Sequence, residues 1–523
     1  MSSWLTLRNA VAVPAQSVPR LPLEDFRQAI IAAPSSNRRV VALYGRPVGT
    51  TIELCAVLAC DRDGLLEVAR TTVEGSTFPS MTSKCAQVHL FEREIGEQWG
   101  LVAEGHPWWK PVRFHKSYRS GQAGHDGQDG QAGQAGQAGH DVWGGPADQS
   151  PTIGVTDFYR VEGDEIHEVA VGPVHAGVIE PGHFRFQCHG EHVFHLEISL
   201  GYQHRGIEKT LAGGPNKRTI HHMETLAGDT TIGHTTAYCQ AIEALAGCRP
   251  SARAQAVRGI ALELERLANH TGDLGALAGD IGYLPTASFC GRLRGDFLNI
   301  TALLCGNRFG RGIVRPGGVA FDMDAERAAK ISARLEDAFK GVEGAAKLLW
   351  QTGSVQARFE DVGRVSKETA AELGMVGPAA RASGLRRDVR THHPFGIFQF
   401  VHIPISTFHT GDVFARAFLR WLEIERSVVF LRGQLRQLPG GAPRATCAPA
   451  KPDSFCVSLV EGWRGEICHV AETDSQGRIS SYKVVDPSFH NWTGLAMSLR
   501  DQQISDFPIC NKSFNLSYCG HDL

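Results

Sequence analysis

Apolar residues recur every three or four positions in three stretches of the second half of the chain, which is the spacing of a buried helix face. These stretches run from Val257 to Leu267, from Ile331 to Leu349 and from Phe414 to Leu435. Residues that commonly start helices stand before them: Pro250-Ser251, Asp324 and Asp412. The pattern predicts long helices that pack together in a bundle.

A shorter pattern occupies the start of the chain. Residues 39–44 and 51–58 are apolar runs, and Gly45, Pro47 and Gly49 lie between them. Short apolar runs around turn residues are typical of a β-hairpin. Because strand-like and helix-like runs alternate in this part of the sequence, we expect a small α/β domain here.

Residues 119–150 separate these two parts. They read RSGQAGHDGQDGQAGQAGQAGHDVWGGPADQS, a repeat of Gly, Gln and Ala without an apolar face. Such a segment buries too little surface to offset the entropy of ordering it, so we expect a flexible linker. The predicted fold class is α+β, with a small α/β domain in residues 1–118 tethered to a mainly helical domain in residues 151–523.

The composition is that of a globular protein, with 42% hydrophobic and 21% charged residues. A formal net charge of −2 argues against nucleic acid as the main partner, because phosphate binding needs a basic surplus. No run approaches the roughly 18 apolar residues of a membrane span, and we expect no secretory signal. If the protein works at a membrane, other subunits hold it there.

The thirteen cysteines form no CxxC pair and no short disulfide framework. Without an export signal, reduced and mostly buried thiols are the expected state. Iron–sulfur clusters usually take four cysteines with some close spacing, so we expect no cluster in this chain.

Several segments follow one another in a fixed order: VGPVHAGVIEPGHFRF, GYQHRGIEK, AYCQAIEALAG, RPGGV, RASGLRRDVRTHHPF and VVDPSFHNW. Together they resemble the large subunit of energy-converting nickel-iron hydrogenases of the formate hydrogenlyase and hydrogenase-4 type, and the related D subunit of respiratory complex I. The earlier FEREIGEQWGL and GHPWWKPVRF resemble the complex I C subunit. The resemblance implies a fusion of a C-like and a D-like, hydrogenase-like domain, in that order.

Hydrogenases of this family hold nickel and iron with four cysteines in two CxxC pairs. Alignment on Ala237-Tyr238 puts the first pair at Ala227 and Thr230, and the second falls near Ser517 and Cys519. Alanine has no ligating atom, and protonated hydroxyls are poor nickel ligands compared with thiolates. We therefore expect no metal bound to this chain and no need for the C-terminal extension that such hydrogenases process. A hydrogenase with substitute ligands is the less favoured alternative.

The complex I D subunit, which has no metal there, binds quinone in the same cavity. Its quinone-binding histidine aligns with His175, which can hydrogen-bond a quinone carbonyl and, as imidazolium, supply a proton. The alternative is a structural loop histidine whose ring nitrogens are hydrogen-bonded to the backbone. The family's second quinone donor is a tyrosine, and Gly228 stands at its position. The resemblance thus implies an incomplete quinone pocket.

Three further residues are candidates for proton transfer or for structural ion pairing. Glu208, in His204–Lys209, matches the glutamate that relays protons in the hydrogenases, although an ion-pair network is equally compatible. Asp229 and His234 belong to the segment that has lost the metal ligands and are candidates for a proton or water path.

The stretch from Arg381 to Asp388 resembles the family's RASG-to-DxR stretch, and these two residues are candidate contacts for the cavity or its cofactor. Closely spaced arginines need partners when they are buried, so we favour a structural brace over catalysis. The DPSF motif at Asp486 is interpreted as scaffold at the cavity wall.

The resemblance also implies the surroundings of the chain. Expected partners are an iron–sulfur small subunit resembling the complex I B subunit, a ferredoxin-like iron–sulfur subunit, and membrane subunits resembling the complex I H and antiporter-like subunits. Iron–sulfur clusters would lie in those partners. Quinone is the candidate ligand of this chain. NAD binding is implied only for the family of complexes and is assigned to no residue here. The expected location is the cytoplasmic face of the cell membrane, held peripherally.

The function predicted from the resemblance is electron transfer: the chain, as a quinone- or ferredoxin-linked oxidoreductase subunit, passes electrons from a neighbouring iron–sulfur subunit to quinone or another acceptor. This transfer would be coupled to ion translocation. The alternative is a non-catalytic structural and proton-coupling scaffold. A cavity lined by both His175 and Glu208 would favour electron transfer, and a cavity occupied by side chains would favour the scaffold.

Overall fold

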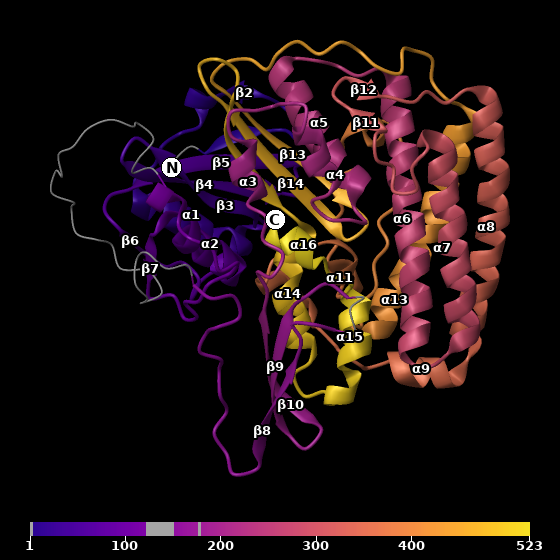
Figure 1. The fold of residues 1–523 in the computed structure, drawn as a ribbon, viewed down its shortest axis with the longest axis horizontal. Helices are drawn as coiled ribbons and strands as arrows, with labels where there is room; N and C mark the ends of the chain where they lie inside the picture. The colour runs from indigo at the N-terminus through magenta and orange to yellow at the C-terminus, as the bar shows by residue number, and fades with distance from the viewer. Residues whose placement is uncertain (1–3, 122–150, 176–178) are drawn as a thin grey trace.

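Long helices pack side by side at one end of the molecule in the computed structural model, which describes residues 4–121, 151–175 and 179–523 (Figure 1). They are α6 (Ala252–Asp280), α7 (Leu284–Cys305), α8 (Ala325–Gln351) and α13 (Val413–Arg436). The side chains of Ser251, Asp324 and Asp412 accept backbone N–H groups at the starts of α6, α8 and α13. The predicted bundle and its start signals are confirmed, and α7 completes it.

The N-terminal region contains an antiparallel sheet with the strand order β1-β5-β4-β3. Its strands are β1 (Leu5–Leu7), β3 (Arg39–Val48), β4 (Thr51–Cys60) and β5 (Leu65–Val73), and its helices are α1 (Leu23–Ala32) and α2 (His89–Trp99). The predicted hairpin is confirmed, because β3 and β4 pair up to Val48 opposite Thr51. Gly49 turns the chain there with φ +58°, in the left-handed region that favours glycine.

A second sheet joins the two ends of the sequence, with the order β15-β14-β13-β2. Its strands are β2 (Val13–Pro14), β13 (Ser454–Gly462), β14 (Gly465–Thr473) and β15 (Ile479–Val485). Every residue of β13 and β14 is buried. Helix α5 (Thr231–Ala246) packs on β13 and β14, and β15 contacts β3 of the N-terminal region. Arg39 pairs with Glu466 (2.6 Å) across this contact, so the two regions share a buried polar seam.

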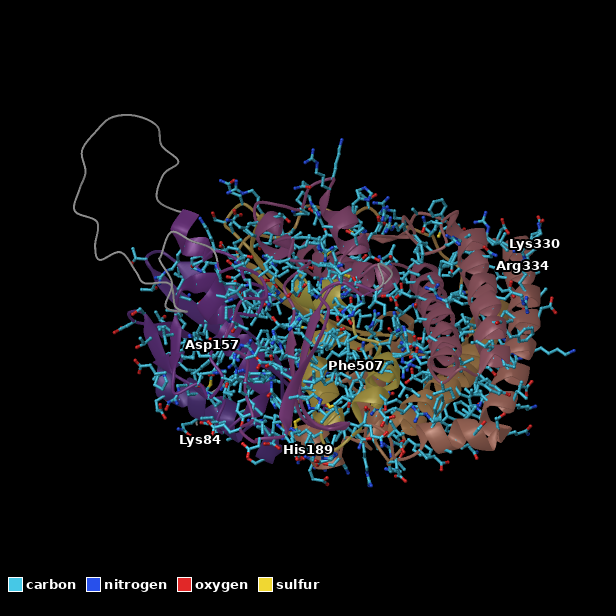
Figure 2. All side chains as sticks on the ribbon, turned by 60° about the horizontal axis from the view of Figure 1, so that its bottom comes forward. Lys84, Asp157, His189, Lys330, Arg334 and Phe507 are labelled. Carbon is cyan, nitrogen blue, oxygen red and sulfur yellow. The ribbon has the colours of Figure 1, made fainter. Side chains whose placement is uncertain are left out.

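A third sheet, β10-β9-β8, extends away from the second one at the bottom of Figure 1. It consists of β8 (Ile166–Val171), β9 (His183–His189) and β10 (His192–Ser199). Phe507 packs against Phe184 and Phe186 of β9, with ring centroids 4.8 and 5.0 Å apart (Figure 2). The predicted α+β class is supported, and helices make up most of the regular structure in residues 151–523, as expected, although two sheets also lie there.

Shorter elements connect these layers. They are β6 (Thr77–Pro79), β7 (Val102–Glu104), α3 (Ile207–Leu211), α4 (Thr219–Glu224), β11 (Val314–Arg315), β12 (Gly318–Val319), α9 (Gly353–Phe359), α10 (Lys367–Glu372), α11 (Gly377–Ala382), α12 (Val389–His392), α14 (Pro487–Ser498), α15 (Phe507–Phe514) and α16 (Tyr518–Asp522). Most of the predicted linker, residues 122–150, lies outside the described residues, so the domain boundaries stay a prediction. Among the residues the structure describes, no helix has the length and apolar character of a membrane span.

All thirteen cysteines fall in the described part of the chain, and all have free thiols. Ten are buried and three are partly exposed. The expectation of mostly buried thiols is confirmed.

Candidate functional site

The fold brings together the two segments to which the resemblance assigns the metal-binding cysteines of nickel-iron hydrogenases. We call the residues at or near those places, Ala227, Thr230, Ser517 and Cys519, the ligand positions. The first two lie just before α5, and the last two lie at the start of α16. Arg205 joins the two segments, because its Nη2 donates to Leu226 O (2.9 Å) and to Cys519 O (3.0 Å).

An ion pair lies at the edge of the ligand positions. Arg464, in the turn between β13 and β14, donates from Nη1 to Asp229 Oδ1 (2.5 Å) and from Nη2 to Oδ2 (2.8 Å). Its Nη1 is also 3.2 Å from the Thr230 hydroxyl. Burial alone would raise the pKa of Asp229, but the Arg464 guanidinium lowers it. The Arg464 guanidinium therefore neutralises the Asp229 carboxylate, which the sequence suggested for a proton or water path.

The side chains at the ligand positions do not fit a nickel-iron centre. Ala227 offers no donor atom, and the Ser517 hydroxyl caps α16 by accepting the Gly520 N–H (2.9 Å). Burial and the nearby Glu180 raise the pKa of Cys519 to about 12, so its thiol is protonated at neutral pH. Across the described residues, no group of three or more His, Cys, Asp or Glu side chains could hold a metal ion.

His234 is fully buried one turn into α5. Its Nε2 lies 3.0 Å from Asp486 Oδ2, and its Nδ1 lies 3.1 Å from His469 Nε2 on β14. Asp486 also caps α14 by accepting the Ser488 N–H (2.8 Å). The DPSF aspartate thus has the scaffold contact that the sequence suggested and, in addition, holds His234. The partner His469 was missed, because no local spacing links two residues 235 positions apart.

His175 and Glu208 lie in separate surroundings. His175 Nε2 is 2.9 Å from Gly182 O, and its ring lies against Phe184. The loop residues that follow it, 176–178, lie outside the described residues. At Gly228, a Cβ would meet nothing within 4 Å, and the residue is exposed, so no side chain replaces the family's tyrosine.

Glu208 belongs to a buried charge network at the seam between α2, α3 and β15. It accepts hydrogen bonds from Gln98 Nε2 (3.1 Å) and Val484 N (3.0 Å), and it pairs with Lys483 (2.9 Å). Lys483 also pairs with Glu94 (2.7 Å), which in turn pairs with Arg113. Burial by itself would raise the pKa of Glu94, but the charges of Lys483 and Arg113 hold that pKa at about 2. The contacts of Glu208 are therefore those of an ion-pair network.

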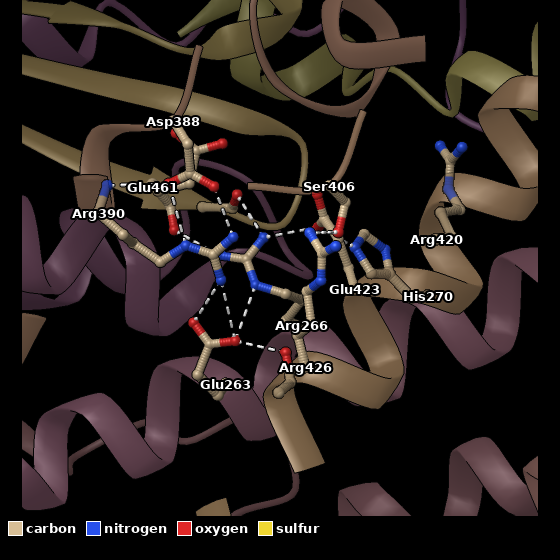
Figure 3. A network of polar contacts seen from close by, with 12 residues as sticks. Glu263, Arg266, His270, Asp388, Arg390, Ser406, Arg420, Glu423, Arg426 and Glu461 are labelled. Atoms are coloured by element: carbon tan, nitrogen blue, oxygen red, sulfur yellow. Dashed lines mark hydrogen bonds and ion pairs between the residues drawn. The ribbon is translucent and has the colours of Figure 1, made fainter. Parts of the chain in front are cut away.

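Arg381 and Asp388 lie in the arginine brace, which consists of the buried Arg266, Arg381 and Arg390 and their carboxylate partners (Figure 3). Arg381 pairs with Glu423 (2.6 Å) and Glu461 (2.7 Å), which come from α13 and β13. Arg390 pairs with Asp388 (2.7 Å) and Glu263 (3.0 Å), so α6 is tied in as well. These contacts join helix bundle and sheet and are those of a structural brace.

Comparisons with known proteins agree with this architecture. Residues 280–451 match the family described as respiratory-chain NADH dehydrogenase, 49 Kd subunit. The D 1 subunit of the NADH-quinone oxidoreductase of Chloroherpeton thalassium is 31% identical over 379 residues, which cover 66% of this chain and 86% of that protein. The carbon monoxide-induced hydrogenase of Rhodospirillum rubrum is 29% identical over 350 residues, 67% of this chain and 97% of the relative.

A longer match includes more of the chain. The hydrogenase-4 component G of Escherichia coli is 25% identical over 451 residues, which are 86% of this chain and 76% of the relative. The resemblance seen in the ordered sequence segments is thereby confirmed. The chain belongs to the family of NADH-quinone oxidoreductase D subunits and the related large subunits of energy-converting hydrogenases.

Proposed function

We propose that this chain is a structural and proton-coupling subunit of a membrane-associated oxidoreductase complex, and that its ligand positions no longer form a redox centre. The family supports the kind of complex, since its members are subunits of complex I and of energy-converting hydrogenases. The donor set supports the loss of the centre. Ala227 has no donor atom, the two hydroxyls are engaged in hydrogen bonds, and the remaining thiol is protonated.

The chemistry at these positions carries the proposal. A bridging metal pair needs several thiolates at once, because soft anionic sulfur both binds the metals and compensates their charge. Here Asp229, the carboxylate next to Thr230, already has a bidentate partner in Arg464. Binding a divalent cation there would require breaking a pair whose side chains are 31% and 5% exposed, respectively.

Quinone reduction is the competing function, and two contacts weigh against it. His175 Nε2 is engaged by Gly182 O, and glycine replaces the second donor at position 228. His175 and Glu208 have different partners, so these contacts do not place them in one shared cavity.

The partners and the location form part of the same proposal. Gly228 is exposed, and Asp229 and Cys519 are partly exposed, so the ligand positions lie near an uncovered face of the chain. We assign this face to the iron–sulfur small subunit, with the ferredoxin-like and membrane subunits completing the complex. The chain would then sit peripherally at the cytoplasmic face of the cell membrane, and the membrane subunits would move the ion.

Metal analysis tests the loss of the redox centre. The full-length chain is purified after growth with nickel and iron, and metals are quantified by mass spectrometry. The matched control is the triple variant A227C/T230C/S517C, which restores three thiols beside Cys519 and should raise metal content to roughly one ion per chain. Background metal in the wild type supports the proposal, whereas stoichiometric nickel in the wild type would overturn it.

A binding titration tests the competing function. A short-chain, water-soluble quinone is added to the purified complex, and quenching of tryptophan fluorescence is followed. We expect no saturable quenching, because both quinone donors are compromised. Saturable quenching in the wild type that is lost in H175A would replace the scaffold proposal with quinone binding.

A further inference from the structure

Two partly exposed thiols, those of Cys248 and Cys447, lie side by side although they are far apart in the sequence. Cys248 Sγ is 3.9 Å from the carbonyl oxygen of Thr446, the residue before Cys447. A hydrogen bond joins the two thiols. The third partly exposed cysteine, Cys519, belongs to the ligand positions, and the other ten are buried. Cys248 and Cys447, which we call the cysteine pair, are therefore two neighbouring thiols within reach of solvent.

The main chain holds both members of the cysteine pair in place. Cys248 follows the glycine that caps the end of α5. Cys447 belongs to residues 437–453, the irregular connection from α13 to β13. This connection is attached to α5, because Lys451 N donates to Leu245 O (2.9 Å). The two sulfur atoms consequently meet across a contact that the backbone already maintains.

The two thiols are not equivalent. Cys248 lines a pocket of about 860 Å³ together with Arg249 and Lys451, so small solutes can reach its sulfur atom. Burial, and next the neighbouring Cys248 thiol, raise the pKa of Cys447 to about 12. Since the thiolate is the nucleophile, Cys248 is the thiol that meets a small oxidant first. Cys447 is placed to attack the oxidised sulfur of Cys248 afterwards.

We propose that the cysteine pair is an oxidation site, which hydrogen peroxide converts into an intramolecular disulfide. The Cys248 sulfur attacks one peroxide oxygen, an S–O bond forms, the O–O bond breaks, and the other oxygen leaves as water with the thiol proton. The Cys447 sulfur then attacks the sulfenic sulfur, so the S–S bond forms and the S–O bond breaks. A second water leaves with the Cys447 proton. Each sulfur atom loses one electron, and the peroxide gains two.

The disulfide would tie the connection between α13 and β13 covalently to the end of α5. Helix α5 packs on β13, so the bond would close one side of the contact between this helix and the second sheet. Thiol–disulfide exchange in a reducing compartment would reopen it, which makes the modification reversible. The inference goes beyond the proposed function and does not depend on it, because neither cysteine belongs to the ligand positions.

Thiol counting and peptide mapping test the oxidation site. The full-length chain is reduced, freed of reductant and treated with hydrogen peroxide, and the remaining thiols are alkylated after unfolding. The wild type should lose two of its thirteen free thiols. The tryptic peptides 219–253 and 445–464, which contain Cys248 and Cys447, should become joined. Dithiothreitol should separate them again.

Each of these peptides contains one further, buried cysteine, so matched variants assign the bond. C239A and C456A remove these buried cysteines and should leave the linkage unchanged. C248S should keep all its remaining thiols. C447S should stop at the sulfenic acid of Cys248, which dimedone traps.

Three results would overturn the oxidation site: a wild type that keeps all its thiols, a linkage that persists in C248S, or a wild type that stops at the sulfenic acid. If a variant does not fold, the wild-type thiol count and peptide map still decide the outcome. Nickel or quinone binding by the wild type would instead overturn the proposed function and leave the disulfide result intact.

Discussion

The arginine brace and the ligand positions meet at one turn of the sheet but differ in charge. Glu461, at the end of β13, accepts from Arg381 of the brace, and Arg464, three residues later, pairs with Asp229. In the brace, several buried arginines are matched by buried carboxylates. At the ligand positions, three of the family's four thiolates are replaced by groups that do not ionise at neutral pH.

This difference separates the residues of the arginine brace, which stabilise the fold, from the ligand positions, which would bind a metal in the hydrogenases. A buried guanidinium without its carboxylate would be costly, so the brace must be kept whole for the chain to fold. A thiolate without a metal has no such structural partner, and its replacement by Ala, Thr or Ser leaves a neutral, hydrogen-bonded site. In this chain the buried brace therefore does not depend on a metal at the ligand positions.

Breaking the brace should have the largest effect. R381A removes the cation that pairs with both Glu423 and Glu461 in a buried site, although Arg266 (3.4 Å) still pairs with Glu423, and we expect a loss of about 3–5 kcal/mol in the free energy of unfolding. Urea titration of the full-length chain measures it. Arg386→Ala is the matched control, because Arg386 is exposed in the same stretch, and it should cost no more than about 0.5 kcal/mol. A loss below about 1 kcal/mol in R381A would show that the brace is not needed for stability.

A smaller effect is expected beside the ligand positions, at Glu265 of α6. Burial raises its pKa to about 8, and it accepts the N–H groups of Ile232 and Gly233. In the unfolded chain Glu265 loses its proton above its ordinary pKa of 4.5, whereas the folded chain keeps the proton up to about pH 8. The stabilisation is therefore fully present below pH 4.5 and is lost as the pH rises toward 8. Glu265 should contribute a fall of about 2–3 kcal/mol between pH 5 and 8.

The variant E265Q should remove the contribution of Glu265 and flatten the profile by that amount, because the amide cannot ionise. Thermal unfolding at a series of pH values compares it with the wild type and with E326Q, whose glutamate lies exposed on α8 and should leave the pH profile unchanged. An identical slope in E265Q and the wild type would mean that Glu265 does not carry the buried proton.

The smallest effect is expected on the outside of the bundle. Lys330 lies at the outer surface of α8 (Figure 2), where it pairs with Glu326 one turn away (2.6 Å). Its side chain is 59% exposed, so water already screens the charge. K330A should change the free energy of unfolding by no more than about 0.5 kcal/mol, measured by the same urea titration. A loss comparable to that of R381A would contradict the contrast between buried and exposed ion pairs.

The sequence predicted those parts of the fold that depend on neighbouring residues. Helices α6, α8 and α13 follow from apolar spacing and a capping side chain, and the β3–β4 hairpin follows from two apolar runs around Gly49. Strands β13 and β14 were missed. Their residues are buried on both faces, so the alternation of apolar and polar residues that identifies a half-exposed strand is absent.

By itself, then, the sequence determined the family, the long helices and the loss of metal-binding thiols at Ala227, Thr230 and Ser517, because these depend on residue identity and short-range spacing. Only the tertiary structure decided which buried polar groups meet. Asp229 finds Arg464, and His234 finds His469 and Asp486, over separations of more than 200 residues. Buried polar groups must be paired, but their partners are chosen by the packing of sheet and helices, which no local pattern encodes.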